Sequence, residues 1–99
     1  MSDWSGTYVF SFPAELPLDA IEDTLMVAAL AVESLVGRPS FKLNASFRLD
    51  KKNRTCRIDA TTPAGKQIAK VFAGLVAREF GEAAYRVERE SITTLAAAN

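Results

Sequence analysis

The N-terminal third of the chain shows two different hydrophobic periods. Residues 7–12, TYVFSF, alternate aromatic and smaller side chains, which predicts a half-buried strand that ends before Pro13. From residue 18 to residue 36, apolar residues recur three or four positions apart, as they do on one face of a helix. This face is formed by Leu18, Ile21, Leu25, Ala28, Val32 and Val36. Gly37 supplies the C-terminal stop of the helix, and Pro39 prevents its continuation.

A hairpin is predicted in the middle of the chain. Apolar and polar residues alternate throughout residues 40–50, SFKLNASFRLD, and this is the clearest strand pattern in the sequence. The turn DKKNR, residues 50–54, connects it to residues 55–61, TCRIDAT, which alternate in the same way. We therefore expect two adjacent antiparallel strands, the first of which turns its apolar residues from Phe41 to Leu49 inward.

A second helix and a last strand complete the pattern. Thr62 and Pro63 form a favourable N-cap and first-turn pair, and Gly81 ends the helix. The predicted core face of this helix consists of Ile68, Phe72, Leu75 and Val76. Alternation returns in residues 84–91, AYRVERES, and predicts the final strand.

The order strand, helix, strand, strand, helix, strand resembles the ferredoxin-like βαββαβ plan. This resemblance implies an α+β two-layer sandwich in which a four-stranded antiparallel sheet carries both helices on one face, with the first and third strands central. The plan hosts many unrelated functions, so it implies no activity. We expect a single domain over residues 1–99, with an ordered core of about residues 6–92 and a frayed tail over residues 93–99.

The composition is that of an ordinary globular protein. Apolar residues make up 48% and charged residues 24% of the 99 positions, which supports a packed core. The single cysteine, Cys56, cannot close an intrachain disulfide, which favours a cytoplasmic setting. The first ten residues lack the basic and apolar regions of a signal peptide. The longest apolar run, residues 25–32, is far shorter than the roughly 20 residues that cross a bilayer, so we expect no membrane association.

Charge is distributed unevenly, although the formal net charge is zero. Residues 1–37 hold six acidic residues and no Lys or Arg, whereas residues 38–57 hold seven basic residues and only Asp50 as an acid. The predicted hairpin thus carries a candidate anion or nucleic-acid patch, which consists of Lys42, Arg48, Lys51, Lys52, Arg54 and Arg57. The alternative is an ordinary solvated hairpin, because the outward positions of the two central strands offer no aromatic side chain on which bases would stack.

The first helix carries a candidate interface. On the side opposite its core face, Met26, Val27 and Leu30 form an apolar cluster where a two-layer fold should be polar. A partner subunit is the simplest cover for this cluster. The alternative is a locally apolar helix that the N-terminal segment around Trp4 shields in part.

The open face of the predicted sheet is a second candidate interface. Its outward residues on the central strands are small or modestly polar, and those of the first strand are Thr7, Val9 and Ser11. Pairing of two sheets across a two-fold axis is a common way to bury such a face, and the acidic and basic regions of the chain could steer the association. We therefore expect self-association, most simply as a homodimer.

The segment TTPAGKQIAK, residues 61–70, places a Gly-Lys pair at the start of the second helix. A phosphate-binding loop needs a glycine five residues before this pair and a Ser or Thr after it, but these positions hold Ala60 and Gln67. Gly65 and Lys66 remain a weak anion site, because backbone N–H groups and the helix dipole favour negative charge there. The simpler interpretation is a capped helix start with a solvated lysine, in which Gly65 permits close packing on the sheet.

Most catalytic chemistry has no residues to carry it. The chain contains no histidine, which removes the usual general base near neutral pH and the commonest metal ligand. Cys56 alternates with core positions, as a buried structural thiol does. Glu79 falls on the core face of the second helix, where we expect an end-of-helix salt bridge to a base such as Arg86. We predict no enzyme activity and no catalytic, cofactor-binding or metal-binding residues.

These patterns favour a small non-catalytic protein that acts through protein–protein contact, as an interaction or homodimerisation module. The alternative function is binding of an anion or a nucleic acid through the basic hairpin, residues 42–57. The two hypotheses use different surfaces, so the arrangement of side chains in space bears on both.

Overall fold

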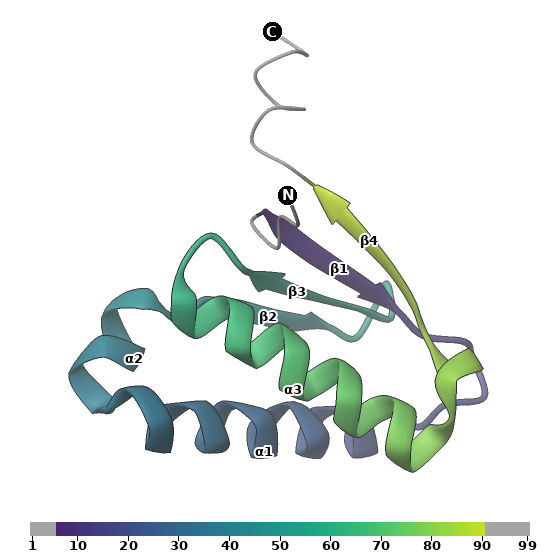
Figure 1. Cartoon of the computed structure of the whole chain (residues 1–99). Helices are drawn as coiled ribbons and strands as arrows, with labels where there is room; N and C mark the ends of the chain where they lie inside the picture. The colour runs from purple at the N-terminus through teal and green to yellow at the C-terminus, as the bar shows by residue number, and fades with distance from the viewer. Residues whose placement is uncertain (1–5, 91–99) are drawn as a thin grey trace, which may run out of the picture.

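The computed structural model of the chain describes residues 6–90 and places its helices against one face of a sheet (Figure 1). In chain order the elements are β1 (Thr7–Ser11), α1 (Leu18–Val36), α2 (Arg38–Asn44), β2 (Phe47–Asp50), β3 (Thr55–Asp59), α3 (Pro63–Phe80), the short 3-10 helix η1 (Glu82–Ala84) and β4 (Arg86–Glu90). The tail over residues 93–99 and the segment around Trp4, which both enter the predictions, lie outside the described residues. Within residues 6–90, no helix combines the length and the apolar character that crossing a bilayer requires.

The strands form one antiparallel sheet in the order β2-β3-β1-β4, so β1 and β3 are central and β2 and β4 are the edges. Tyr8 pairs with Ile58 and Phe10 pairs with Cys56, and these side chains face the helices. α1 and α3 pack side by side over that face (Figure 1). The α+β class with a four-stranded antiparallel sheet is confirmed, but the described part of the chain has three α-helices where two were predicted.

The two long helices have the predicted bounds. Thr62 is the N-cap of α3, and its Oγ1 accepts a hydrogen bond from the N–H of Gly65 at 3.1 Å. Gly37 and Gly81 follow the last residues of α1 and α3 with φ of 89° and 96°, a left-handed conformation that favours glycine. The helix stops read from the sequence are therefore confirmed.

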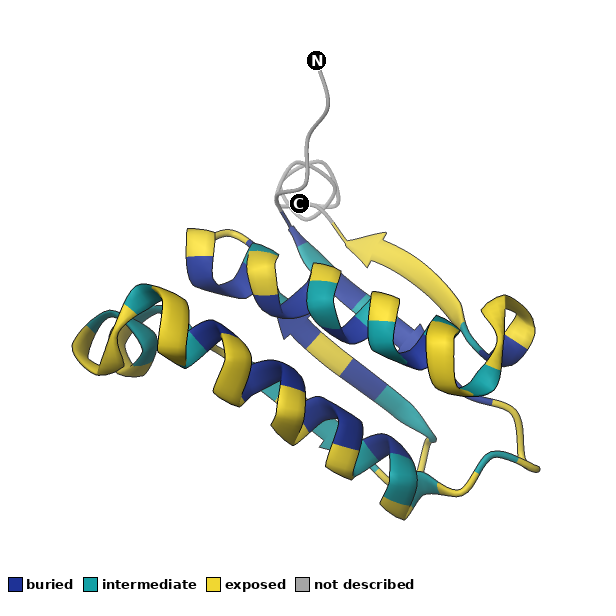
Figure 2. Ribbon diagram, turned by 60° about the horizontal axis from the view of Figure 1, so that its bottom comes forward, coloured by how far each residue is buried: buried dark blue, intermediate teal, exposed yellow. Residues whose placement is uncertain are grey.

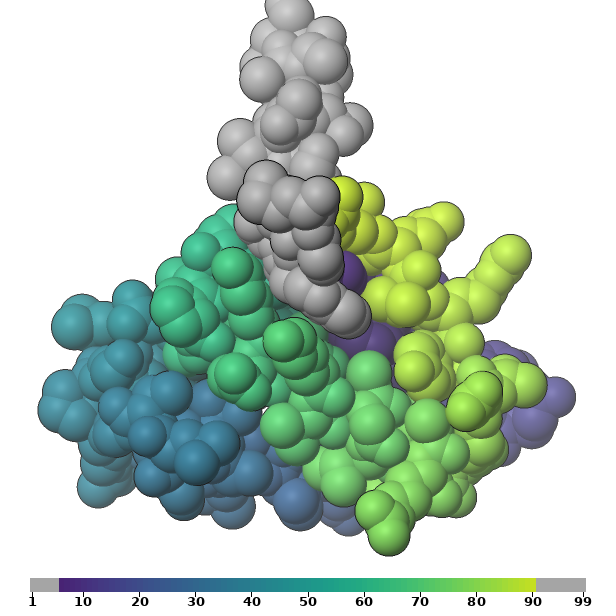
Figure 3. Space-filling view, viewed as in Figure 1, coloured from purple at the N-terminus to yellow at the C-terminus, as the bar shows by residue number. Residues whose placement is uncertain are grey.

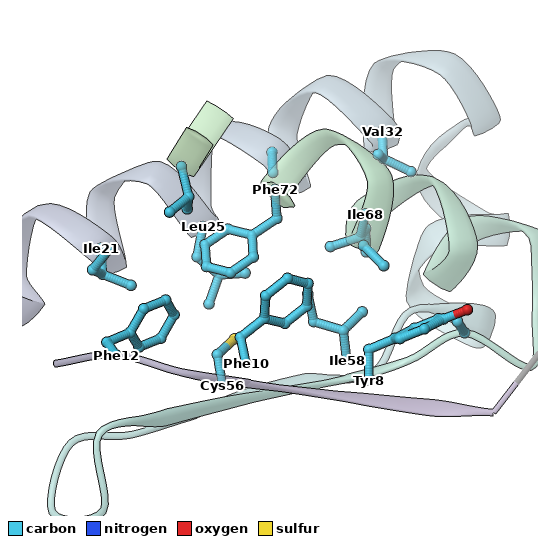
Figure 4. Close-up of a cluster of buried hydrophobic side chains, with 14 of the residues drawn as sticks. Tyr8, Phe10, Phe12, Ile21, Leu25, Val32, Cys56, Ile58, Ile68 and Phe72 are labelled. Atoms are coloured by element: carbon cyan, nitrogen blue, oxygen red, sulfur yellow. The ribbon is translucent and has the colours of Figure 1, made fainter. Parts of the chain in front are cut away.

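The core lies between the helical layer and the covered face of the sheet. Figure 4 shows the side chains of β1 and β3 pointing at those of α1 and α3. The largest fully buried side chains of the core are those of Phe10, Phe72, Ile21, Ile58, Ile68, Val32, Val76 and Cys56. Phe10 and Phe72 meet edge to face with ring centroids 5.1 Å apart, a favourable aromatic geometry. Sheet and helices are thereby joined through one apolar cluster.

The long strand predicted over residues 40–50 is wrong. Residues Arg38–Asn44 form α2, and only Phe47–Asp50 pair with β3. Pro39 lies in the first turn of α2, where its fixed φ favours the start of a helix. The helix packs Phe41 against the core and leaves Leu43 84% exposed, so the apolar alternation does not reflect a pleat. Since β3 has five residues, a longer β2 would leave its extra N–H and C=O groups unpaired.

The last strand begins two residues later than predicted. Ala84 belongs to η1 and is buried, and the strand proper is Arg86–Glu90. All five residues of β4 are exposed, and four of them are charged. Figure 3 shows side chains of β4 projecting along one edge of the molecule. Such charges on an edge strand discourage the addition of further strands.

Candidate functional site

Three apolar side chains lie next to one another on the outer surface of α1, on the side turned away from the sheet. Met26, Val27 and Leu30 are 50%, 54% and 60% exposed, and we call them the α1 outer face. Residues three and four apart share one side of a helix, which makes the three side chains contiguous. Figure 2 shows the exposed positions of α1 opposite its buried ones. The predicted exposure of this cluster is confirmed.

A groove runs beside the α1 outer face, between α1 and α3. It has a volume of about 210 Å³ and is lined by Ala20, Asp23, Thr24, Val27, Leu75 and Glu79. The buried Thr24 hydroxyl lies 2.9 Å from Glu79 Oε1 and 3.0 Å from the carbonyl oxygen of Ala20. A hydroxyl has one proton to donate, so these two acceptors compete for it. The predicted bond from Glu79 to Arg86 is wrong, because Glu79 accepts from Thr24 instead and ties α3 to α1.

Every second residue of the strands points away from the helices, and these residues form the open sheet face. It consists of Arg48 and Asp50 in β2, Thr55, Arg57 and Asp59 in β3, Thr7, Val9 and Ser11 in β1, and Arg86, Glu88 and Glu90 in β4. Thr7, Val9 and Ser11 lie where the sequence predicted them and are half-buried. Arg57 reaches across β1, and its Nη1 donates a hydrogen bond to Glu90 Oε1 at 2.7 Å.

Some charges of the open sheet face are satisfied within the chain and others are not. The hydrogen bond from Arg57 to Glu90 raises the pKa of Arg57. The pKa of Asp50 is lowered, because its carboxylate accepts hydrogen bonds from the side chain and the backbone N–H of Asn53. In the part of the chain that the structure describes, no ion pair involves Arg48, Arg86 or Glu88. Arg48 nevertheless contributes to the lowered pKa of Asp50, which lies on the same face of β2.

The six basic residues of the predicted hairpin patch do not form one surface. Lys42 lies in α2, so its predicted position on the open sheet face is wrong. Lys52 is exposed in the turn between β2 and β3. Arg48 and Arg57 are the Cα partners that face each other across β2 and β3, an arrangement of like charges that lowers sheet stability. The hairpin therefore offers scattered charges instead of a continuous basic groove.

Lys51 and Arg54 are occupied within the chain. Lys51 Nζ lies 3.3 Å from Glu22 Oε1 in the first turns of α1. Arg54 has a left-handed backbone with φ of 56°. Its guanidinium donates hydrogen bonds to carbonyl oxygens of the loop between β1 and α1, which belong to Phe12, Pro13 and Leu16. Arg54 is thus a structural clamp between the hairpin turn and this loop.

Gly65 is buried at the start of α3, against the end of β3. A Cβ atom at this position would lie 1.7 Å from the carbonyl oxygen of Asp59, so the close approach of helix and strand requires glycine. The N–H of Gly65 donates to Thr62 Oγ1, and the N–H of Lys66 donates to the carbonyl oxygen of Thr62 at 3.0 Å. Both N–H groups are therefore used by the helix start. This geometry supports the packing explanation for Gly65, and the weak anion site at Gly65 and Lys66 stays a prediction.

Cys56 is a structural thiol, as its position among core residues predicted. It is 0% exposed and lies in β3, on the sheet face that the helices cover (Figure 4). Burial raises the pKa of Cys56 to about 12. The thiolate that would act as a nucleophile is therefore disfavoured at neutral pH.

The edge charges of the open sheet face were missed from the sequence. Arg86, Glu88 and Asp50 were visible as charged residues, but their common face follows only from the strand register. The alternation of residues 86–90 contains this signal once β4 is placed beside β1. The contact between Thr24 and Glu79 joins residues 55 positions apart and had no local signal.

Comparisons of the chain with protein families, with curated proteins and with solved structures give no match. Its function is therefore inferred from the α1 outer face, the adjacent groove and the open sheet face.

Proposed function

We propose that this chain is a small, non-catalytic protein-interaction module that binds another protein molecule through the α1 outer face. The observation that carries the proposal is the exposure of Met26, Val27 and Leu30, each by half or more, side by side on one helix. Isolated apolar side chains are common on protein surfaces, whereas contiguous ones mark sites that a partner covers. Covering them would contribute roughly 25 cal/mol per Å² of apolar surface removed from water.

The neighbouring groove supports a protein partner over a small ligand. Val27 and Leu75 continue the apolar surface into it, and Asp23 and Glu79 place carboxylates beside them. Its volume of about 210 Å³ is below the roughly 300–1,000 Å³ of typical small-molecule sites. An apolar side chain of a partner fits the floor of such a groove, and a basic group fits its acidic rim.

Two observations support the absence of catalysis as part of this proposal. Cys56 is sealed in the core with a raised pKa, which removes the chain's only thiol from nucleophilic chemistry. The sequence has no histidine, so the commonest general base is missing.

We interpret the architecture as a ferredoxin-like plan into which α2 is inserted between α1 and β2. The strand order β2-β3-β1-β4 and the packing of α1 and α3 over one face support this interpretation. The free thiol of Cys56 agrees with a cytoplasmic setting, where thiols stay reduced.

Site-specific photo-crosslinking tests the proposal. A photoreactive amino acid replaces Leu30 in one variant and Leu43 in a matched control, which is an even more exposed leucine located on α2. Each variant is irradiated in an extract of the source cells and, separately, as purified protein. We expect a defined protein adduct from position 30 and none from position 43. The mass of the adduct distinguishes a second copy from a different protein.

A competing change on the same surface checks that the adduct reports binding. Met26→Glu in the position-30 variant should reduce the adduct yield at least about tenfold, because a charge beside the crosslinker opposes apolar burial. Circular dichroism verifies that the variant stays folded. The proposal would be wrong if positions 30 and 43 gave equal adduct yields, or if position 30 gave no adduct in either sample.

A further inference from the structure

The open sheet face has a charge pattern that the strand register makes explicit. One row across the sheet reads Asp50, Thr55, Ser11, Arg86 from β2 to β4. The next row reads Arg48, Arg57, Val9, Glu88. Each row therefore carries opposite charges at its two ends. Which end is positive alternates from one row to the next.

The opposite charges at the two ends of one row do not pair with each other. β2 and β4 are separated by three strand spacings, about 14 Å. Among residues 6–90, Arg48, Arg86 and Glu88 belong to no ion pair, although Arg48 attracts Asp50 on the same strand and helps to lower its pKa. A second molecule with the same rows can supply a close opposite charge to each end.

The middle of the face allows another sheet to approach. β1 contributes only Thr7, Val9 and Ser11 there, which are short side chains. A shallow depression of about 290 Å³ beside them is lined by Thr7, Ser46, Phe47, Arg48, Arg57 and Asp59. The ion pair between Arg57 and Glu90 crosses this central region, whereas the charges without an ion pair among the described residues lie in the two edge strands.

We propose that a second copy of this chain docks on the open sheet face, sheet against sheet, about a two-fold axis that runs parallel to the strands between β3 and β1. This rotation brings β2 of one copy over β4 of the other and keeps each row opposite itself. Arg48 then faces the partner's Glu88, and Asp50 faces the partner's Arg86. By symmetry each contact occurs twice. Aligned packing of sheets about 10 Å apart is a standard geometry.

A two-fold axis across the strands is the other way to pair the sheets. Through the second row, it would place Arg48 against the partner's Arg48 and Glu88 against the partner's Glu88, and like charges in contact oppose association. Midway between the two rows, it would place Arg48 against the partner's Asp50 and Glu88 against the partner's Arg86. Reversing Arg48 and Glu88 together restores opposite charges only under the axis parallel to the strands, so the double variant distinguishes the two axes.

This inference goes beyond the proposed function, because the α1 outer face takes no part in the contact. The helices lie on the opposite side of the sheet, so both copies keep Met26, Val27 and Leu30 exposed (Figure 2). The dimer would present two such faces on its two outer surfaces. Either proposal can therefore fail without the other.

Charge reversal and its rescue, followed by sedimentation equilibrium at low salt, test the dimer. The wild-type chain should be a dimer whose dissociation constant rises with salt. Arg48→Glu alone and Glu88→Arg alone should each raise the dissociation constant at least about tenfold, because each places like charges in contact twice. The double variant Arg48→Glu, Glu88→Arg restores opposite charges and should return the constant to within about threefold of wild type.

Two controls and circular dichroism keep the outcome clear. Lys52→Glu makes the same kind of charge change in the hairpin turn, away from the face, and should leave the dimer unchanged. Leu30→Glu should also leave it unchanged, which separates this dimer from binding at the α1 outer face. A monomeric wild-type chain from micromolar to millimolar concentration overturns the proposal. It is equally overturned by single variants that dimerise normally, or by a double variant that stays as weak as the single ones while folded.

Discussion

The two faces of the sheet are built from alternate residues of the same strands, and they differ in nearly every property. On the covered face, Cys56 and Ile58 are 0% exposed and meet the aromatic residues of β1 and α3. On the open face, Arg57 and Asp59 alternate with those positions along β3 and carry charge. The comparison shows that one alternating segment can divide two tasks, because successive strand residues point in opposite directions.

The division separates stability from association. Apolar area removed from water is the main stabilising contribution to folding, and the covered face contains most of that area in the sheet. The open face contributes charges and short side chains, which add little to folding but define how another sheet would fit. Substitutions on the two faces should therefore differ in size and in the measurement that detects them.

The largest effect is expected from breaking the covered face at Phe72. Its side chain is 0% exposed, and its ring lies 5.1 Å from that of Phe10 and 6.2 Å from that of Phe12. Phe72→Ala should lower the free energy of unfolding by about 3–5 kcal/mol through lost burial and a residual cavity. Urea unfolding of dilute monomer, followed by circular dichroism, measures this. The neighbouring Val71→Ala, at a partly buried position, should cost only about 1 kcal/mol, and equal losses would contradict the comparison.

The thiol of Cys56 allows the burial of the covered face to be tested through the pH dependence of stability in alkaline solution. Burial raises its pKa from 9.0 to about 12, so the folded state holds this proton more tightly than the unfolded chain does. The resulting stability is fully present below pH 9 and is lost as pH rises toward 12. Within that window the free energy of unfolding should fall by up to about 1.4 kcal/mol per pH unit from this group.

Cys56→Ala provides the reference for this effect, because alanine does not ionise. The difference in unfolding free energy between wild type and variant should shrink steadily above pH 9, whatever the other groups contribute. A difference that stays constant between pH 7 and pH 11 would show that the thiol is not sealed in the covered face.

The smallest effect is expected on the open face, at the ion pair between Arg57 and Glu90. The two side chains are 53% and 51% exposed, and solvent screens a pair of this kind. A double-mutant cycle with Arg57→Ala and Glu90→Ala should give a coupling energy of about 0.2–1 kcal/mol that decreases with added salt. A coupling energy above about 2 kcal/mol would contradict the expectation that the open face contributes little to the stability of the fold.

The elements with a strong local signal were predictable. Both long helices follow from a period that runs through many residues and ends in a glycine, and Thr62 is the N-cap that its sequence context indicates. The failure at residues 40–50 has a physical cause. Apolar alternation over a few residues is also compatible with a short helix that leaves one of its apolar side chains exposed, as α2 leaves Leu43. The partner strand β3 has only five residues, so it can pair with only a short β2.

The candidate surfaces were predictable only where one element defines them. Met26, Val27 and Leu30 share one helix, so their exposure follows from its period. The hairpin patch depended on where separate segments fold, and neighbours distant in the sequence took up Lys51 and Arg54. The charge rows of the open sheet face depended on a register between β1 and β4, which nothing local specifies.

Gly65 also bears on how the ancestry of such a chain can be traced. The requirement for glycine comes from a backbone oxygen, that of Asp59, and not from any side chain or bound group. A descendant could exchange every residue of the α1 outer face and of the open sheet face, and acquire a different partner, while this glycine is retained under selection for folding alone. A glycine shared at this position would record inherited architecture. Descent of function would be recorded in the surfaces, which are free to diverge.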